Sequence, residues 1–258
     1  MRAELVHPSP VLLAGAAVIA QIFYPLVYGD ARDLLGIVSV VFFCAASVTH
    51  AALTRGARTS LVLVGAFAGG GFLIEALGLA TGVPFGRYSY GDGLGPAVLG
   101  VPLVVGLAWA MMAWPSWVVA GRLTAGRWSR IAVAAWALAS WDLFLDPQMV
   151  SAGYWRWADP EPGLPGVYGV PLTNHLGWLV VAGVLMLVFA GLAGSREVPD
   201  YLDAVPVGLF LWVYFSSILA HTVFFGLTYA AAWGAVGMGV VAVPVATKRA
   251  GRRRLRQS

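Results

Sequence analysis

The chain alternates long apolar runs with short polar connections. A helix that crosses a bilayer needs about 20 predominantly apolar residues. Eight segments meet or approach that length, and they are 10–28, 34–53, 60–80, 97–120, 131–146, 171–193, 204–222 and 229–247. The pattern predicts an all-α, polytopic membrane bundle of about eight transmembrane helices, built as a single integral membrane domain over residues 1–258. The fifth segment is the shortest and ends on two aspartates, so a bundle of seven helices is the alternative.

Composition supports a membrane protein. Hydrophobic residues make up 59% of the 258 residues and charged residues only 11%, which excludes an ordinary soluble domain. The one cysteine, Cys44, lies inside an apolar run and can form neither an internal disulfide nor a metal cluster.

The net charge of +4 comes mostly from a basic tail, residues 248–258, directly after the last apolar run. A basic cluster in that position is typical of a cytoplasmic anchor on anionic lipid. We therefore expect the lipid bilayer, and not nucleic acid, as the partner of this tail.

The basic residues divide unevenly between the connections. With both termini in the cytoplasm, the outer loops carry only Arg32, Arg87 and Arg156. The inner segments carry all the others, which are Arg2, Arg55, Arg58, Arg122, Arg127, Arg130, Arg196 and the six basic residues of the tail. Because positive charge is retained on the cytoplasmic side, the sequence predicts a multi-pass plasma-membrane protein with both termini cytoplasmic.

This orientation brings the membrane-embedded titratable residues to one side, apart from His50. Glu75 lies near the outer end of the third segment, and Asp142 and Asp146 lie near the outer end of the fifth. The two aspartates are four residues apart, which places them on the same face of a helix. We expect four further residues at the same outer level, which are Asn174, His175, Tyr214 and His221. Ionisable groups inside a membrane are a functional-site hypothesis by default.

An internal repeat relates the two long outer loops. Arg87 and Arg156 are each followed by a GVPL motif, at 100–103 and 169–172, with a constant offset of 69 residues. Trp109 and Trp178 are related by the same offset. Because each unit contains two helices, this predicts a parallel repeat about an axis along the membrane normal, with both loops flanking one cavity.

The third segment carries a stripe of small residues around its glutamate. Its members are Ala68, Gly71, Glu75, Gly78 and Gly82. Small residues usually allow helices to pack closely. The alternative is a narrow lane for a slender apolar molecule that ends at Glu75.

The Asp142/Asp146 pair allows three interpretations. The two residues can be ordinary helix-end aspartates at the headgroup level. They can form the DxxxD motif of a membrane prenyltransferase, which holds a diphosphate through magnesium, but the other acidic pair, Asp200 and Asp203, falls on the opposite face. The third interpretation is acid–base chemistry on an apolar substrate. Glu75 is then the best candidate for the proton donor, because burial disfavours a charged carboxylate. No metal site is predicted, since the histidines lack metal-ligand spacing.

Two stretches carry a resemblance to a known family. FGRYSYGDGLGPAVLGVPL (85–103) and WDLFLDPQMV…GYWRW…GVYGVPLTNHLGW (141–178) resemble the membrane carotenoid-biosynthesis family, which includes carotenoid 1,2-hydratases. The likeness extends over roughly residues 60–225. It implies an enzyme that adds water across the terminal double bond of an acyclic carotenoid without a cofactor, alongside other carotenoid-pathway enzymes of the membrane.

That chemistry assigns roles to the outer residues. Glu75, Asp142 and Asp146 are the candidate catalytic residues, with the two aspartates orienting water, and Pro147 is expected to end the helix and leave Asp146 nearest to solvent. The candidate substrate-binding residues are Arg87, Tyr88, Tyr90, Asp92, Trp141, Tyr154, Trp155, Trp157, Asn174, His175, Trp178, Tyr214 and His221. Their aromatic rings form either an interfacial belt or π-faces for a carbocation. A lycopene-type cyclase and a non-enzymatic carotenoid or lipid carrier are the alternatives.

Overall fold

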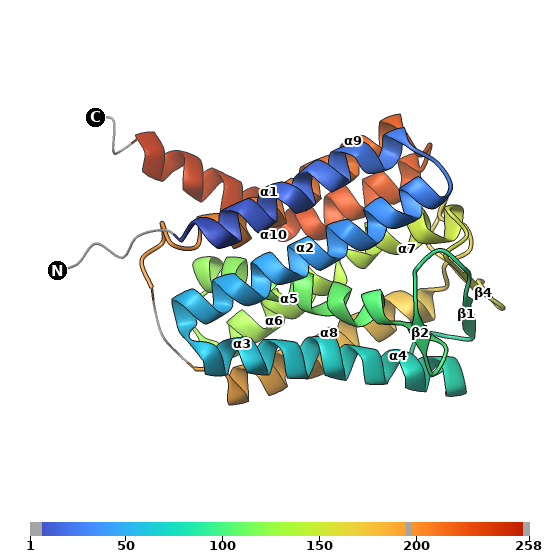
Figure 1. Ribbon diagram of the computed structural model, residues 1–258, viewed down its shortest axis with the longest axis horizontal. Coiled ribbons are helices and arrows are strands. Elements are labelled where there is room, and N and C mark those ends of the chain that lie inside the picture. Colours follow the sequence, from blue (N-terminus) through green and yellow to red (C-terminus); the bar gives the residue numbers. More distant parts are fainter. Residues whose placement is uncertain (1–6, 195–197, 255–258) are drawn as a thin grey trace.

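The computed structural model describes residues 7–194 and 198–254, and it is a bundle of long helices (Figure 1). The helices are α1 (Pro8–Phe23), α2 (Asp30–Arg55), α3 (Ala57–Leu63), α4 (Gly70–Thr81), α5 (Leu103–Leu123), α6 (Arg127–Ala139), α7 (Asp142–Ser151), α8 (Leu172–Leu192), α9 (Ala204–Val223) and α10 (Thr228–Arg254). A π-helical turn, Val64–Gly69, joins α3 to α4, so that Ala57–Thr81 forms one continuous span.

Within the described residues, seven helical spans are long and apolar enough to cross a membrane. They correspond to seven of the eight predicted segments, and the protein is therefore a multi-pass membrane protein. The remaining segment, predicted at 131–146 as one helix, is divided into α6 and α7 at Ser140–Trp141. Figure 1 shows that α6 and α7 together carry the chain from one end of the bundle to the other. The predicted fifth segment is thus a helix interrupted at Ser140–Trp141, and it is not among the seven candidate spans of the described residues.

Helix α5 lies at the centre of the bundle, and most of its residues are buried. It packs against α2 and α9 on one side and against α6 on the other. In Figure 1, α1, α2, α9 and α10 lie together, and α3, α4 and α8 lie together across α5. Its core side chains include Trp109, Met112 and Trp114, none of them more than 1% exposed. The bundle is packed around these large side chains, because close van der Waals packing between helices stabilises a bundle within a membrane.

Two short sheets, which the all-α prediction lacked, cover one end of the bundle. Strand β1 (Tyr88–Tyr90) pairs antiparallel with β4 (Trp155–Trp157), and β2 (Ala97–Val98) pairs with β3 (Val101–Pro102). The chain next to the β1–β4 pair approaches its neighbour closely at Gly91, where a Cβ would lie 2.5 Å from the carbonyl oxygen of Gly153. The β1–β4 pair ties the two long loops together above the helices.

The stripe of small residues serves helix packing. A Cβ on Gly71 would lie 2.6 Å from the Trp109 ring, and a Cβ on Gly78 would lie 3.0 Å from both Phe85 and the Tyr88 hydroxyl. The stripe is therefore filled by aromatic side chains of the same protein, and the close-packing interpretation is confirmed. The 69-residue repeat stays a prediction, although its two related tryptophans, Trp109 and Trp178, stack with ring centroids 4.0 Å apart.

His50 lies at the opposite end of the bundle from Glu75, on α2. Its Nδ1 accepts a hydrogen bond from Trp114 Nε1 (3.1 Å), so its Nε2 donates to the backbone carbonyl of Leu202 (2.7 Å). Beside it, Arg55 forms a paired salt bridge with the carboxylate of Asp203. These contacts tie the start of α9 to α2 and α5. The predicted basic tail begins in α10, and its side chains beyond Lys248 lie outside the described residues, as do Arg2 and Arg196.

Candidate active site

A cavity of about 390 Å³ lies at the end of the bundle that the strands cover. Helices α1, α2, α4, α5, α7, α8 and α9 contribute to its wall, and the lining is mostly apolar and aromatic. Of the residues proposed from sequence, the wall contains Glu75, Tyr88, Tyr90, Trp141, Asp146, Tyr154, Trp155, Trp157, Asn174 and Trp178. The long loops and segments that are distant in sequence therefore do meet around one space.

Glu75 is buried in this wall and accepts three hydrogen bonds. Its Oε2 accepts from the hydroxyls of Tyr88 (2.5 Å) and Tyr90 (2.9 Å), and its Oε1 accepts from Trp109 Nε1 (3.1 Å). The Tyr88 hydroxyl also lies 3.2 Å from the backbone carbonyl of Glu75. Tyr88 can therefore donate to that carbonyl and accept a hydrogen bond from a protonated carboxyl group, so the arrangement accommodates a protonated as well as an ionised Glu75.

The two tyrosines are reliable hydrogen-bond donors. Burial raises the pKa of the Tyr88 and Tyr90 hydroxyls, and the neighbouring Glu75 carboxyl raises it further. Both hydroxyls consequently stay protonated at neutral pH and hold the carboxyl group in a fixed orientation.

The two aspartates occupy different depths behind the cavity wall. Asp146 lines the cavity and is 2% exposed, whereas Asp142 lies behind it and is fully buried. The Asn174 amide donates to both, at 3.1 Å to Asp142 and by a shorter contact to Asp146. His175 Nδ1 contacts Asp142 Oδ2 at 2.7 Å. Because both carboxyl groups accept from the same Asn174 amide nitrogen, they lie close to each other.

The expectation that Pro147 ends the helix is wrong. Helix α7 begins only at Asp142 and continues through Pro147 to Ser151. A proline at this position removes one intrahelical hydrogen bond, but the helix continues past it. Asp146 is therefore buried in the cavity wall and not exposed to solvent.

Aromatic rings surround the carboxyl groups. Tyr88 lies against Trp157 with centroids 5.7 Å apart, and Tyr90 meets Trp155 edge-on at 5.8 Å. Trp178 stacks on Trp109 and is met edge-on by Trp141. The cavity thus presents π-faces near three carboxyl groups, Glu75, Asp142 and Asp146, in a low-dielectric space.

Six of the proposed residues lie outside the cavity wall. Asp142 and His175 stand behind Asp146, as described above. Arg87 forms an exposed ion pair with Asp159, and Asp92 is exposed in its loop. Tyr214 donates to the backbone of Ala235 on α10, and His221 lies between the carbonyl oxygens of Ser217 and Phe144, where it joins α9 to α7.

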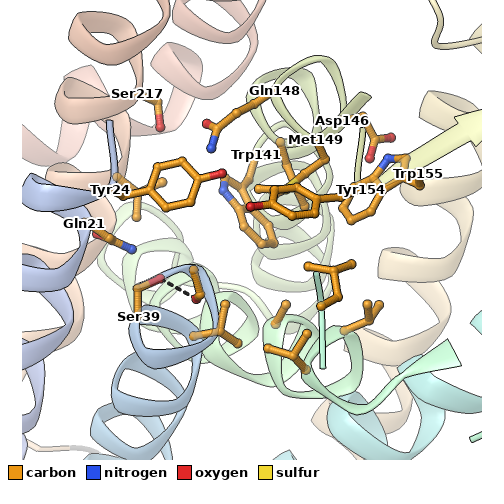
Figure 2. Close-up of a pocket in the computed structure, with 18 of the residues that line it drawn as sticks. Gln21, Tyr24, Ser39, Trp141, Asp146, Gln148, Met149, Tyr154, Trp155 and Ser217 are labelled. Carbon is orange, nitrogen blue, oxygen red and sulfur yellow. Dashed lines mark hydrogen bonds between the residues drawn. The ribbon is translucent and has the colours of Figure 1, made fainter. Parts of the chain in front are cut away.

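The opposite wall, from α1, α2 and α9, was not anticipated. Figure 2 shows Gln21, Tyr24 and Ser217 across the cavity from Asp146 and Trp155, with Gln148 also facing inward. The Gln21 amide oxygen accepts from Trp212 Nε1 at 2.7 Å. No hydrogen bond within the described residues engages the side chains of Gln148 and Ser217. A glutamine inside the first apolar run was the signal in the sequence for this polar wall.

Comparison with known proteins identifies the family. Residues 35–245 match the family model described as carotenoid biosynthesis protein. Over 166 residues the chain is 32% identical to the bisanhydrobacterioruberin hydratase of Haloarcula japonica, a match that covers 60% of this chain and 55% of that protein. The chain thus matches little more than half the length of this curated relative. No solved structure matches the chain. The family model matches most of the length of this chain, and the chain therefore belongs to the carotenoid biosynthesis protein family, as the resemblance predicted.

Proposed function

We propose that this protein hydrates the terminal carbon–carbon double bond of an acyclic carotenoid end group. The observation that carries the proposal is the placement of Glu75 and Asp146 in the wall of one apolar, aromatic cavity. A neutral hydrocarbon suits this cavity, because an anionic substrate such as a diphosphate would face the carboxyl groups without compensation. The similarity to a hydratase of the same family supports this choice of reaction.

The first step is protonation of the alkene. Glu75 transfers its proton to the less substituted carbon, the π-bond supplies the electron pair, and a tertiary carbocation forms at the other carbon. The hydroxyls of Tyr88 and Tyr90 then stabilise the carboxylate that remains, since both donate to its Oε2. The surrounding indole and phenol rings face the cation.

The second step is capture of the cation by water. Asp146 accepts a hydrogen bond from a water molecule in the cavity and takes one of its protons as the oxygen bonds to carbon. Asn174 fixes the Asp146 carboxyl group, and Asp142 with His175 lies directly behind it. Return of the proton from Asp146 to Glu75 completes a cycle in which the net change is the addition of one water.

The alternative within the same chemistry is a cyclase, in which a neighbouring double bond captures the cation. Hydration is favoured because Gln21, Gln148 and Ser217 line the same cavity as the carboxyl groups and can hold water there. A non-enzymatic carotenoid carrier would need neither acid nor base.

Isotopic labelling tests the proposal. Membranes that contain the protein are incubated with an acyclic carotenoid such as lycopene in ¹⁸O-labelled water, without added nucleotide, flavin or metal. We expect a tertiary alcohol that carries the label. An isomeric ring product would favour the cyclase, and an unchanged pigment that still binds would favour the carrier.

We further propose that the reaction takes place at the outer leaflet of the plasma membrane, with both termini cytoplasmic.

A further inference from the structure

The cavity has a mouth, and it lies between α1 and α9. Among the described residues that line the cavity, the most exposed are Ile22 (46%), Leu26 (53%), Leu219 (57%) and Phe224 (47%). The first two belong to the end of α1 and the turn that follows it, and the other two belong to the end of α9. Helices α1 and α9 contact each other, and the exposed lining residues lie at the ends of both helices, so we place the opening at these ends.

The rim of this mouth is apolar and belongs to membrane-spanning helices. Ile22 and Leu219 lie inside candidate spans, Pro8–Leu26 and Ala204–Val223. Neighbouring residues on the outer surface of the same helices, such as Ile19 and Val223, are also large, apolar and exposed. Such surfaces contact lipid chains when the helices cross a bilayer. The mouth therefore opens toward hydrocarbon and not toward water.

The cavity is too small for a whole polyene. Gathered into one compact space, 390 Å³ would be about 9 Å across, whereas an extended acyclic carotenoid is roughly as long as the hydrocarbon core is thick, about 30 Å. Only the end of such a molecule fits beside Glu75 and Asp146. The rest of the chain must leave through the mouth, where the apolar rim matches its chemistry.

We propose that the rim formed by Ile22, Leu26, Leu219 and Phe224 is a lateral portal for one end of an acyclic polyene dissolved in the bilayer. The reacting end enters between α1 and α9, and the remaining chain stays among the lipid tails. This inference rests on the proposed function for the identity of the substrate. It adds that the protein selects the end group and not the chain length, and that the two ends of a symmetrical polyene react in separate binding events.

Tryptophan substitutions test the portal. Ile22→Trp and Leu219→Trp narrow the mouth, and Ile19→Trp and Val223→Trp, which place the same ring on lipid-facing positions outside the cavity wall, are the matched controls. Because the association step is slowed, kcat/KM should fall about tenfold or more in the portal variants and change by no more than about twofold in the controls. Wild-type kcat/KM should agree within about threefold for two polyenes of different length that share an end group. Equal activity of portal and control variants, or a steep dependence on chain length, would overturn the proposal.

A binding measurement keeps the portal separate from the chemistry. The amount of polyene that co-purifies with each variant is read from its visible absorbance per protein, in preparations with unchanged thermal unfolding. Loss of pigment from the portal variants alone supports the portal, whether or not the wild type converts the polyene. Absence of conversion by the wild type would remove only the hydratase proposal. Equal pigment in all variants, or recovery of lipid in place of added polyene from the wild type, would remove the portal.

Discussion

Replacement of Glu75 by glutamine is the most informative single change. The amide keeps the shape of the side chain but has no acidic proton, so the first step of the proposed mechanism is lost. Removing a general acid typically costs about 10²–10⁴-fold in rate, which corresponds to about 3–5 kcal/mol in the barrier. We expect a loss near the upper end of this range, because no cation forms without protonation.

The hydrogen bonds around Glu75 set the structural cost of this change. Trp109 can still donate to the amide oxygen, but Tyr88 and Tyr90 both donate to the other oxygen, which becomes an NH₂ group. Tyr88 can donate to the backbone carbonyl of Glu75 instead. One or two bonds worth about 1 kcal/mol each are therefore disturbed, and the free energy of unfolding should fall by about 1–2 kcal/mol.

The assay combines conversion with pigment binding. Glu75→Gln should insert into membranes and bind the polyene, while incorporation of oxygen from labelled water is lost. Tyr88→Phe is the matched control, because it removes one hydrogen bond from the same oxygen and leaves the acid in place, and its rate should fall only about tenfold. Near-normal conversion by Glu75→Gln would refute the role of Glu75 and transfer the proton donor to Asp146.

Three further predictions follow from the same structure. Asp146→Asn should lower conversion about 10²-fold, and Asp142→Asn only about tenfold, since Asp146 lines the cavity and Asp142 does not; comparable kcat values for the two variants would contradict this order. His50→Ala should destabilise the protein by about 1–3 kcal/mol in thermal unfolding, because Trp114 Nε1 loses its acceptor, while conversion per folded protein stays unchanged. Reporters inserted in 122–130 or after Ser258 should read cytoplasmic, and one in 156–166 external; the reverse pattern would remove the outer placement of the cavity.

The sequence predicted the seven apolar helical spans and one wall of the candidate site. Glu75, Asp146 and Asn174 stood out because polar groups are costly inside a membrane, and the orientation of the predicted helices placed them at one level. The structure shows them together around one cavity. The family was also accessible from the motifs in the two long loops, and the family match confirms it.

The other half of the site could not be derived in this way. Hydrophobic runs indicate where a helix crosses, but they do not indicate which helices are neighbours, so nothing in the sequence placed Gln21 of α1 opposite Asp146 of α7. The break at Ser140–Trp141 was hidden as well, because the apolar pattern continues across it without Gly or Pro. The prediction that Asp146 faces solvent failed for the same reason, since the start of α7 decides where Pro147 falls in the helix.

The outcome of carbocation chemistry depends on which nucleophile is held near the cation, because protonation alone leads equally to hydration and to cyclisation. A purely aromatic and aliphatic wall would leave a folded polyene as the nearest nucleophile. Here a carboxyl group fixed by Asn174 lines one side of the cavity, and the amides of Gln21 and Gln148 line another. Amides and carboxylates in a mostly apolar space bind water, since unpaired polar groups there are costly. The polar wall opposite the acids therefore connects the hydratase proposal to the chain's own residues, independently of the family to which it belongs.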